Sequence, residues 1–167
     1  MTISQSTYEQ LLDILRICFD LNARSDSIAY CLDYFYYNKL AKLYHHSWAH
    51  FFPQLADIVS DEMLKHNALP KRLAVKEYSY DTEDFFNLFN LNLEGILELK
   101  RAIRSGIEIA DMNNDIEIRI FLENLLQDVE TNYEKQAYEW LNAAKVLSKS
   151  DFNIHVEDYT NFITKVE

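Results

Sequence analysis

The side chains best suited to chemistry crowd into one short stretch of this 167-residue chain, where four of its five histidines lie between positions 45 and 66. His46, His50, Asp57 and Asp61 follow one another at spacings of 4, 7 and 4 residues. On an α-helix these spacings place all four on one stripe. Imidazole and carboxylate ligands together suit Fe(II), Mn(II) or Zn(II). The spacing therefore predicts a candidate metal-binding stripe.

This stripe faces roughly opposite the apolar side chains of the same predicted helix, Trp48, Leu55 and Val59, and so looks outward. Its two ends would lie about 22 Å apart along the helix axis. One subunit could not gather all four ligands around one metal, so we expect a complete site only at a contact between subunits. The alternative is a solvated polar face with two ordinary surface histidines.

Glu62 and His66 form a second candidate metal-binding pair, one helical turn apart and on the same face as Leu55. A buried glutamate and histidine need partners, because an unpaired polar group in a protein interior is costly. A metal ion would satisfy both side chains, and so would mutual hydrogen bonds or a bond to a nearby tyrosine. Both interpretations stay open from the sequence.

Long helices must position these residues, because the chain has only two glycines and two prolines. Sheet folds need many more turn residues, and phosphate-binding loops need clustered glycines. Pro53 predicts a kink in the second helix. Two short turns and one long connection predict an all-α four-helix bundle with one long crossover. Apolar periodicity predicts the helices of this single domain over about 7–37, 39–67, 82–111 and 116–147, with a short C-terminal segment over 151–165.

Two motifs resemble a known superfamily. The run from Ile109 to Asp115, followed by Phe121-Leu122-Glu123, looks like the turn between the third and fourth helices of ferritins. The run from Asp57 to Glu62, leading into Leu69-Pro70, is similar to the end of the second helix in Dps proteins, the mini-ferritins. The resemblance covers about residues 40–145. It implies a ferritin-like fold and a homo-oligomeric protein that binds iron, oxidises it as a ferroxidase does, and sequesters it.

The same resemblance bears on the ligands. His46, Asp57 and Asp61 match positions of histidine or acid ligands at the Dps type of iron site, which subunits share, whereas Tyr30 stands where a histidine belongs. The chain contains no Glu-x-x-His, the motif that ferritins carry inside the bundle, and Val129 stands where the fourth helix would supply a ligand. The glutamates of the last two helices, Glu94, Glu98, Glu123 and Glu134, lie off the apolar stripes and are expected on a solvated face. The resemblance thus implies an incomplete ligand set and reduced iron oxidation.

The net charge of the chain limits the kinds of partner that it can bind. Asp and Glu number 27 against 16 Lys and Arg, for a formal net charge of −11. This balance disfavours direct nucleic-acid binding and anionic membranes. It favours metal cations, copies of the chain itself or a basic protein partner. Two alternatives to iron handling therefore remain, a metal-free ferritin-like scaffold and an acidic protein-binding module of the immunity-protein type.

The remaining features concern the cellular compartment. Cys18 and Cys31 lack CxxC spacing and are expected to be two buried thiols in a reducing cytoplasm. No secretory signal and no spanning apolar segment is visible, so a cytoplasmic protein is expected.

Overall fold

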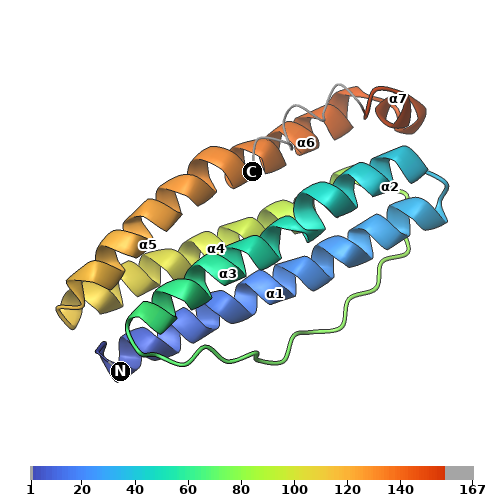
Figure 1. The fold of residues 1–167 in the computed structure, drawn as a ribbon. Helices are drawn as coiled ribbons and strands as arrows, with labels where there is room; N and C mark the ends of the chain where they lie inside the picture. Colours follow the sequence, from blue (N-terminus) through green and yellow to red (C-terminus); the bar gives the residue numbers. More distant parts are fainter. Residues whose placement is uncertain (1, 157–167) are drawn as a thin grey trace.

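The computed structural model describes residues 2–156, which contain helices and no strand. The chain forms four long helical segments, called arms below because two of them consist of more than one helix (Figure 1). The first is α1 (Gln5–Tyr34) and the third is α4 (Phe85–Met112). Each of the other two arms contains a π turn, and a short last helix follows. The second arm is α2 (Asn38–Tyr44), η1 (His45–Ala49) and α3 (Phe51–Lys65); the fourth is α5 (Ile116–Asp128), η2 (Val129–Glu134) and α6 (Lys135–Val146); α7 is Lys149–Ile154.

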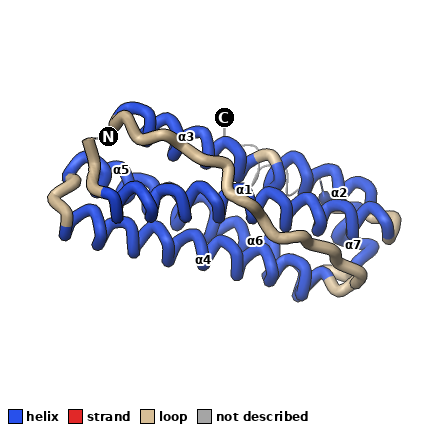
Figure 2. Tube along the Cα trace, turned by 90° about the horizontal axis from the view of Figure 1, so that it is seen from below, coloured by secondary structure: helices blue, strands red, loops and turns tan. Residues whose placement is uncertain are grey.

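The arms pack side by side, with α1 against α3 and α4, and α4 against α5 and α6. Short turns join the first two arms and the last two arms. The second and third arms are joined by residues 66–84, which run along the bundle over α1 (Figure 2). This is the single-crossover bundle expected from the sequence. The four predicted helices end within three residues of the observed arms, while the predicted C-terminal segment extends beyond residue 156 and so partly outside the described residues.

Local residue chemistry explains most helix ends. Ser4 caps α1 by accepting a hydrogen bond from the Thr7 N–H, and Asp84 caps α4. The predicted start of the third helix, at residue 82, is therefore three residues early. Asn67 and Asn114 adopt the left-handed conformation, with φ of 51° and 58°, that ends a helix. Asn114 thus forms the tight turn predicted between the last two arms.

The irregularity of the second arm is not at Pro53, where a kink was predicted, because Pro53 lies within the α-helix α3. The irregularity lies one turn earlier, at η1, where the His50 N–H donates to the carbonyl of His45 at 3.2 Å. In a regular helix the carbonyl of Ala49 would accept the N–H that residue 53 lacks as a proline. Asn22 of α1 supplies a donor instead, because its Nδ2 lies 2.6 Å from that carbonyl. The polar stretch of α1 around Asn22 therefore continues the helix and supplies a contact to the second arm.

Near the midpoints of the arms the interior is filled by apolar and aromatic groups. Cys18, Phe52, Val129 and Tyr133 are at most 3% exposed, and the rings of Phe51 and Tyr133 are 3.7 Å apart. Burial raises the pKa of the Cys18 thiol to about 12. Both cysteines are buried and free, as expected.

Helical periodicity places Tyr30 and Asp33 on the same face of the first helix as Leu15, toward the core, and this prediction is wrong. Tyr30 is 65% exposed, and Asp33 is exposed as well. Both lie in the last turns of α1, where Cys31 and Leu32 are the residues that face the core. The apolar stripe of α1 therefore does not extend through Tyr30 and Asp33.

Candidate functional site

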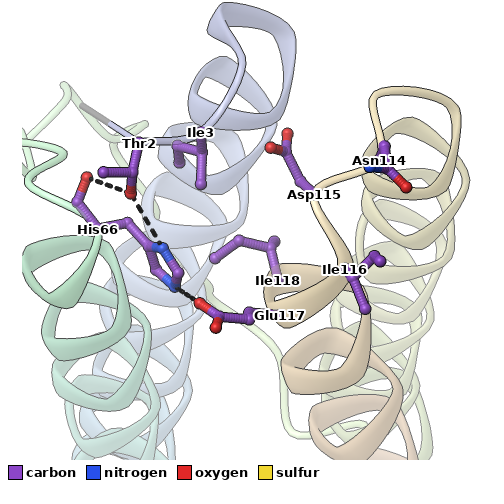
Figure 3. Close-up of a pocket in the computed structure, with 8 residues that line it drawn as sticks. All are labelled: Thr2, Ile3, His66, Asn114, Asp115, Ile116, Glu117 and Ile118. Atoms are coloured by element: carbon purple, nitrogen blue, oxygen red, sulfur yellow. Dashed lines mark hydrogen bonds and ion pairs between the residues drawn. The ribbon is translucent and has the colours of Figure 1, made fainter.

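The pair Glu62 and His66 lies at one end of the bundle, where α3 gives way to the crossover. His66 is 8% exposed, and its Nε2 lies 3.4 Å from Oε1 of Glu62. The same nitrogen lies 3.7 Å from Oε2 of Glu117 on α5, and Nδ1 lies 3.3 Å from the hydroxyl of Thr2. Figure 3 shows His66 held between Thr2 and Glu117. The mutual hydrogen bond, one of the two interpretations open from the sequence, is therefore present.

This end of the bundle also carries a perturbed carboxylate, Asp115. It accepts hydrogen bonds from the backbone N–H of Ser4, at 3.1 Å to the nearer oxygen. Partial burial by itself would raise the pKa of Asp115. The hydrogen bonds from Thr7 and Ser4 and the charge of His66 lower this pKa, and together they outweigh burial, so the net shift is downward. The open pocket lined by His66 and Asp115 has a volume of about 230 Å³. That volume is small for an organic ligand but sufficient for water or an ion.

A second cluster lies at η1 and consists of three imidazole rings. The ring centroids of His45 and His50 are 4.4 Å apart, those of His46 and His50 are 5.3 Å apart, and those of His45 and His46 are 5.8 Å apart. His45 Nδ1 also lies 2.9 Å from Oδ1 of Asp26 on α1. Desolvation lowers the pKa of His46, and the neighbouring His50, His45 and Lys42 add to the effect because each disfavours a further positive charge.

The predicted stripe is only partly assembled. His46 and His50 are exposed and in contact with each other, whereas Asp57 and Asp61 are exposed farther along α3. Within residues 2–156 no hydrogen bond or ion pair joins either aspartate to either histidine. The outward orientation is thus as predicted, and the separation along one helix keeps the two pairs apart. Sequence reasoning missed His45, Asp26 and Glu117 as neighbours of the candidate ligands, because these contacts arise from the π turn and from other helices.

The bundle interior does not fit a dinuclear metal centre. Asp20 and His66 are the only buried carboxylate and imidazole in the described chain, and His66 lies at the bundle end. Asp20 accepts a hydrogen bond of 2.6 Å from the Tyr78 hydroxyl and another from the Lys76 N–H, which ties the crossover to α1. Across residues 2–156 no three His, Cys, Asp or Glu side chains are placed to hold a metal ion. The apolar filling at Tyr133 occupies the space that interior ligands would need.

The glutamates of the last two arms lie outside this interior, but only part of the set is on a solvated face. Glu94 and Glu123 are exposed, as predicted, whereas Glu98 is partly buried at 3.8 Å from Arg24 of α1. Glu134 is half-buried and pairs with Lys100 of α4 at 2.7 Å. Its hydrogen bond is the largest of the effects that raise the pKa of Lys100, so this carboxylate already has a cationic partner from the protein.

Solved structures show what this arrangement is similar to. A ferritin with an open pore from the hyperthermophilic archaeon Archaeoglobus fulgidus superimposes with a TM-score of 0.84 at 15% identity, covering 94% of each chain. The chain has the ferritin-like fold. A bacterioferritin of Rhodobacter capsulatus, whose structure has a metal-free dinuclear site and haem iron, matches with a TM-score of 0.78 at 16% identity, over 92% of this chain and 94% of that one.

The likeness is one of structure. No family model matches the sequence, and no curated protein does so either. Within the described part of the chain, no helix has both the length and the apolar character needed to cross a bilayer.

Proposed function

We propose that this ferritin-like chain works as a homo-oligomer that handles metal ions, iron among them, on its surface and at subunit contacts. The observation that carries the proposal is the apolar filling of the bundle interior around Cys18, Phe52, Val129 and Tyr133. Among residues 2–156, that interior leaves no room for the carboxylate and imidazole ligands of an oxidation centre inside one bundle. Iron binding and any remaining oxidation would then depend on exposed ligands, of which the stripe His46, His50, Asp57 and Asp61 is the first candidate set.

The crossover and α3 support association between copies. Residues 71–77 of the crossover are all exposed and carry three basic side chains and one acidic one in a chain of net charge −11. Leu73 and Val75 add exposed apolar area on the crossover, and Ile58 and Leu64 do so on α3. The basic segment of one copy can face the exposed Asp57 and Asp61 on α3 of another copy. A two-fold axis would repeat that contact.

A second candidate function, binding of a basic protein, has its own support. Tyr30, Tyr34 and Tyr36 are 65%, 73% and 85% exposed at one end of the bundle. Tyrosine is enriched at protein interfaces, where it contributes contact area and can stack on cationic side chains. A monomeric chain without metal affinity would favour this function or a metal-free scaffold over metal handling.

The test combines native mass with iron chemistry. Light scattering of the untagged protein should give a defined oligomer, and anaerobic titration should show Fe(II) binding. On exposure to air, iron should oxidise slowly, without a fast phase that saturates at a fixed number of irons per chain. A fast saturating phase would contradict the proposal, because it requires an assembled oxidation centre. The double variant Asp57→Asn, Asp61→Asn should weaken binding at the stripe while circular dichroism stays unchanged, since both side chains are exposed.

A further inference from the structure

The π turn η1 brings together side chains that a regular helix would separate. In an α-helix, residues 45 and 50 would point about 140° apart. Here the bond from the His50 N–H to the carbonyl of His45 closes a wider turn, so their rings lie 4.4 Å apart, with His46 beside both. Three imidazoles thus share one patch of the surface, and none of them is needed in the core.

We propose that His45, His46 and His50 form a binding site for a late first-row divalent ion such as Ni²⁺, Cu²⁺ or Zn²⁺ within a single subunit. Imidazole nitrogen suits these ions, and Fe²⁺ and Mn²⁺ bind the same donors more weakly. The centroid of a ligating imidazole lies about 3 Å from its metal, so two rings on one ion have centroids no more than about 6 Å apart. All three centroid distances, 4.4, 5.3 and 5.8 Å, meet this limit.

His45 is the ligand that the fold places beside a carboxylate. Its Nδ1 lies 2.9 Å from the buried Oδ1 of Asp26, an ion-pair contact without the alignment of a hydrogen bond, and no other described group donates to that oxygen. A small rotation of the ring aligns Nδ1–H with this carboxylate and leaves Nε2 free to bind a metal. A carboxylate behind a histidine ligand is a common way to fix the ring and increase its basicity. Asp26 comes from α1, so the orientation depends on packing between two helices.

His46 and His50 supply the adjustable part of the site. In this structure the three rings are not yet arranged around one point. His46 and His50 are exposed, so their rings can turn about the side-chain bonds without disturbing the core. Lys42 is the positive group that faces His46 from the preceding turn. It is exposed and can move away, while Asp26 keeps negative charge on the other side of the cluster.

The inference deepens the proposed surface handling of metal, but it needs neither assembly nor iron oxidation. It also differs from the sequence expectation, because His45 and Asp26 take the place of Asp57 and Asp61. Equilibrium dialysis or calorimetry of the untagged chain with Ni²⁺ should show one saturable site per chain, and with Zn²⁺ the same. His50→Asn should remove that site, and Asp26→Asn should weaken it about 10- to 100-fold.

The double variant Glu94→Gln, Glu123→Gln, which removes two exposed carboxylates far from η1, is the matched control and should bind Ni²⁺ as the parent does. Circular dichroism of each variant establishes that the helices are intact. No saturable Ni²⁺ binding by the parent, or equal binding by the parent and His50→Asn, would overturn the inference. Loss of binding in the Glu94→Gln, Glu123→Gln control would also overturn it, because binding would then follow the overall negative charge and not the three histidines. None of these results depends on the native mass or on the iron assay, so the two proposals can fail separately.

Discussion

The hydrogen bond from Asn22 to the carbonyl of Ala49 gives a direct test of how the second arm accommodates Pro53. Ala49 is fully buried, and the Nδ2 of Asn22 lies 2.6 Å from its carbonyl oxygen. Asn22→Leu keeps the size of the side chain and removes the donor. A buried carbonyl left without a partner costs about 1–3 kcal/mol. For a chain of this length, that corresponds to a fall in Tm of roughly 2–12 °C.

Pro53→Ala provides the matched background for this experiment. It returns an N–H at the position where a regular helix would donate to Ala49, so Asn22 should matter less. Urea unfolding of the four proteins at one fixed protein concentration, followed by circular dichroism, measures the coupling. We expect Asn22→Leu to cost less in the Pro53→Ala background by at least about 0.5 kcal/mol. An equal cost in both backgrounds would refute the argument that Asn22 replaces the missing donor of Pro53.

Two further perturbations test the packing and the acid side of the stability curve. A Cβ at Gly95 would meet a leucine methyl at 2.2 Å, whereas at Gly106 the nearest atom is at 2.9 Å. Gly95→Ala should therefore lower the free energy of unfolding by about 1–3 kcal/mol, and Gly106→Ala should lower it by less. Equal losses of both variants in urea unfolding would contradict this. Partial burial raises the pKa of Asp115 and the hydrogen bonds of Thr7 and Ser4 lower it more, so the folded pKa is depressed. Asp115 therefore stabilises the fold at pH values above its pKa in the unfolded chain, and this stabilisation is lost as the pH falls through its pKa in the folded protein. Asp115→Asn should make the free energy of unfolding, measured with denaturant, fall less steeply between about pH 5 and pH 2.

The fold could be predicted from the sequence because two simple signals agree. Scarcity of glycine and proline leaves few places for turns, and apolar residues recur at the helical period along four long stretches. The predicted connection between residue 67 and residue 82 is too long for a hairpin turn, which favours the crossover topology. Both signals depend only on local composition and on the spacing of apolar residues, so they can be used without knowledge of tertiary contacts.

The histidine cluster shows where such reasoning stops. Periodicity at 100° per residue places His46 and His50 on one side and assigns His45 elsewhere. The π turn changes the directions in which the side chains of residues 45–50 point from the helix axis. Asn22, on another helix, donates a hydrogen bond to the carbonyl of Ala49 at the end of this turn. Contacts of that kind are tertiary, so the grouping of His45 with Asp26 carries no mark in the sequence. The exposure of Tyr30 is a similar case, since a tyrosine satisfies both an apolar face and a solvated one.

The absence of interior ligands among the described residues is compatible with the fold for a physical reason. Carboxylates inside a bundle are costly unless a metal or a cation pairs with them. Packed side chains such as Phe52, Val129 and Tyr133 remove that cost and add buried apolar area, so the four arms hold together without a metal. The two candidate sites lie where the regular helix is interrupted or ends, the three histidines at η1 and His66 at the end of α3 before Asn67. There the backbone geometry rather than the core decides which side chains meet.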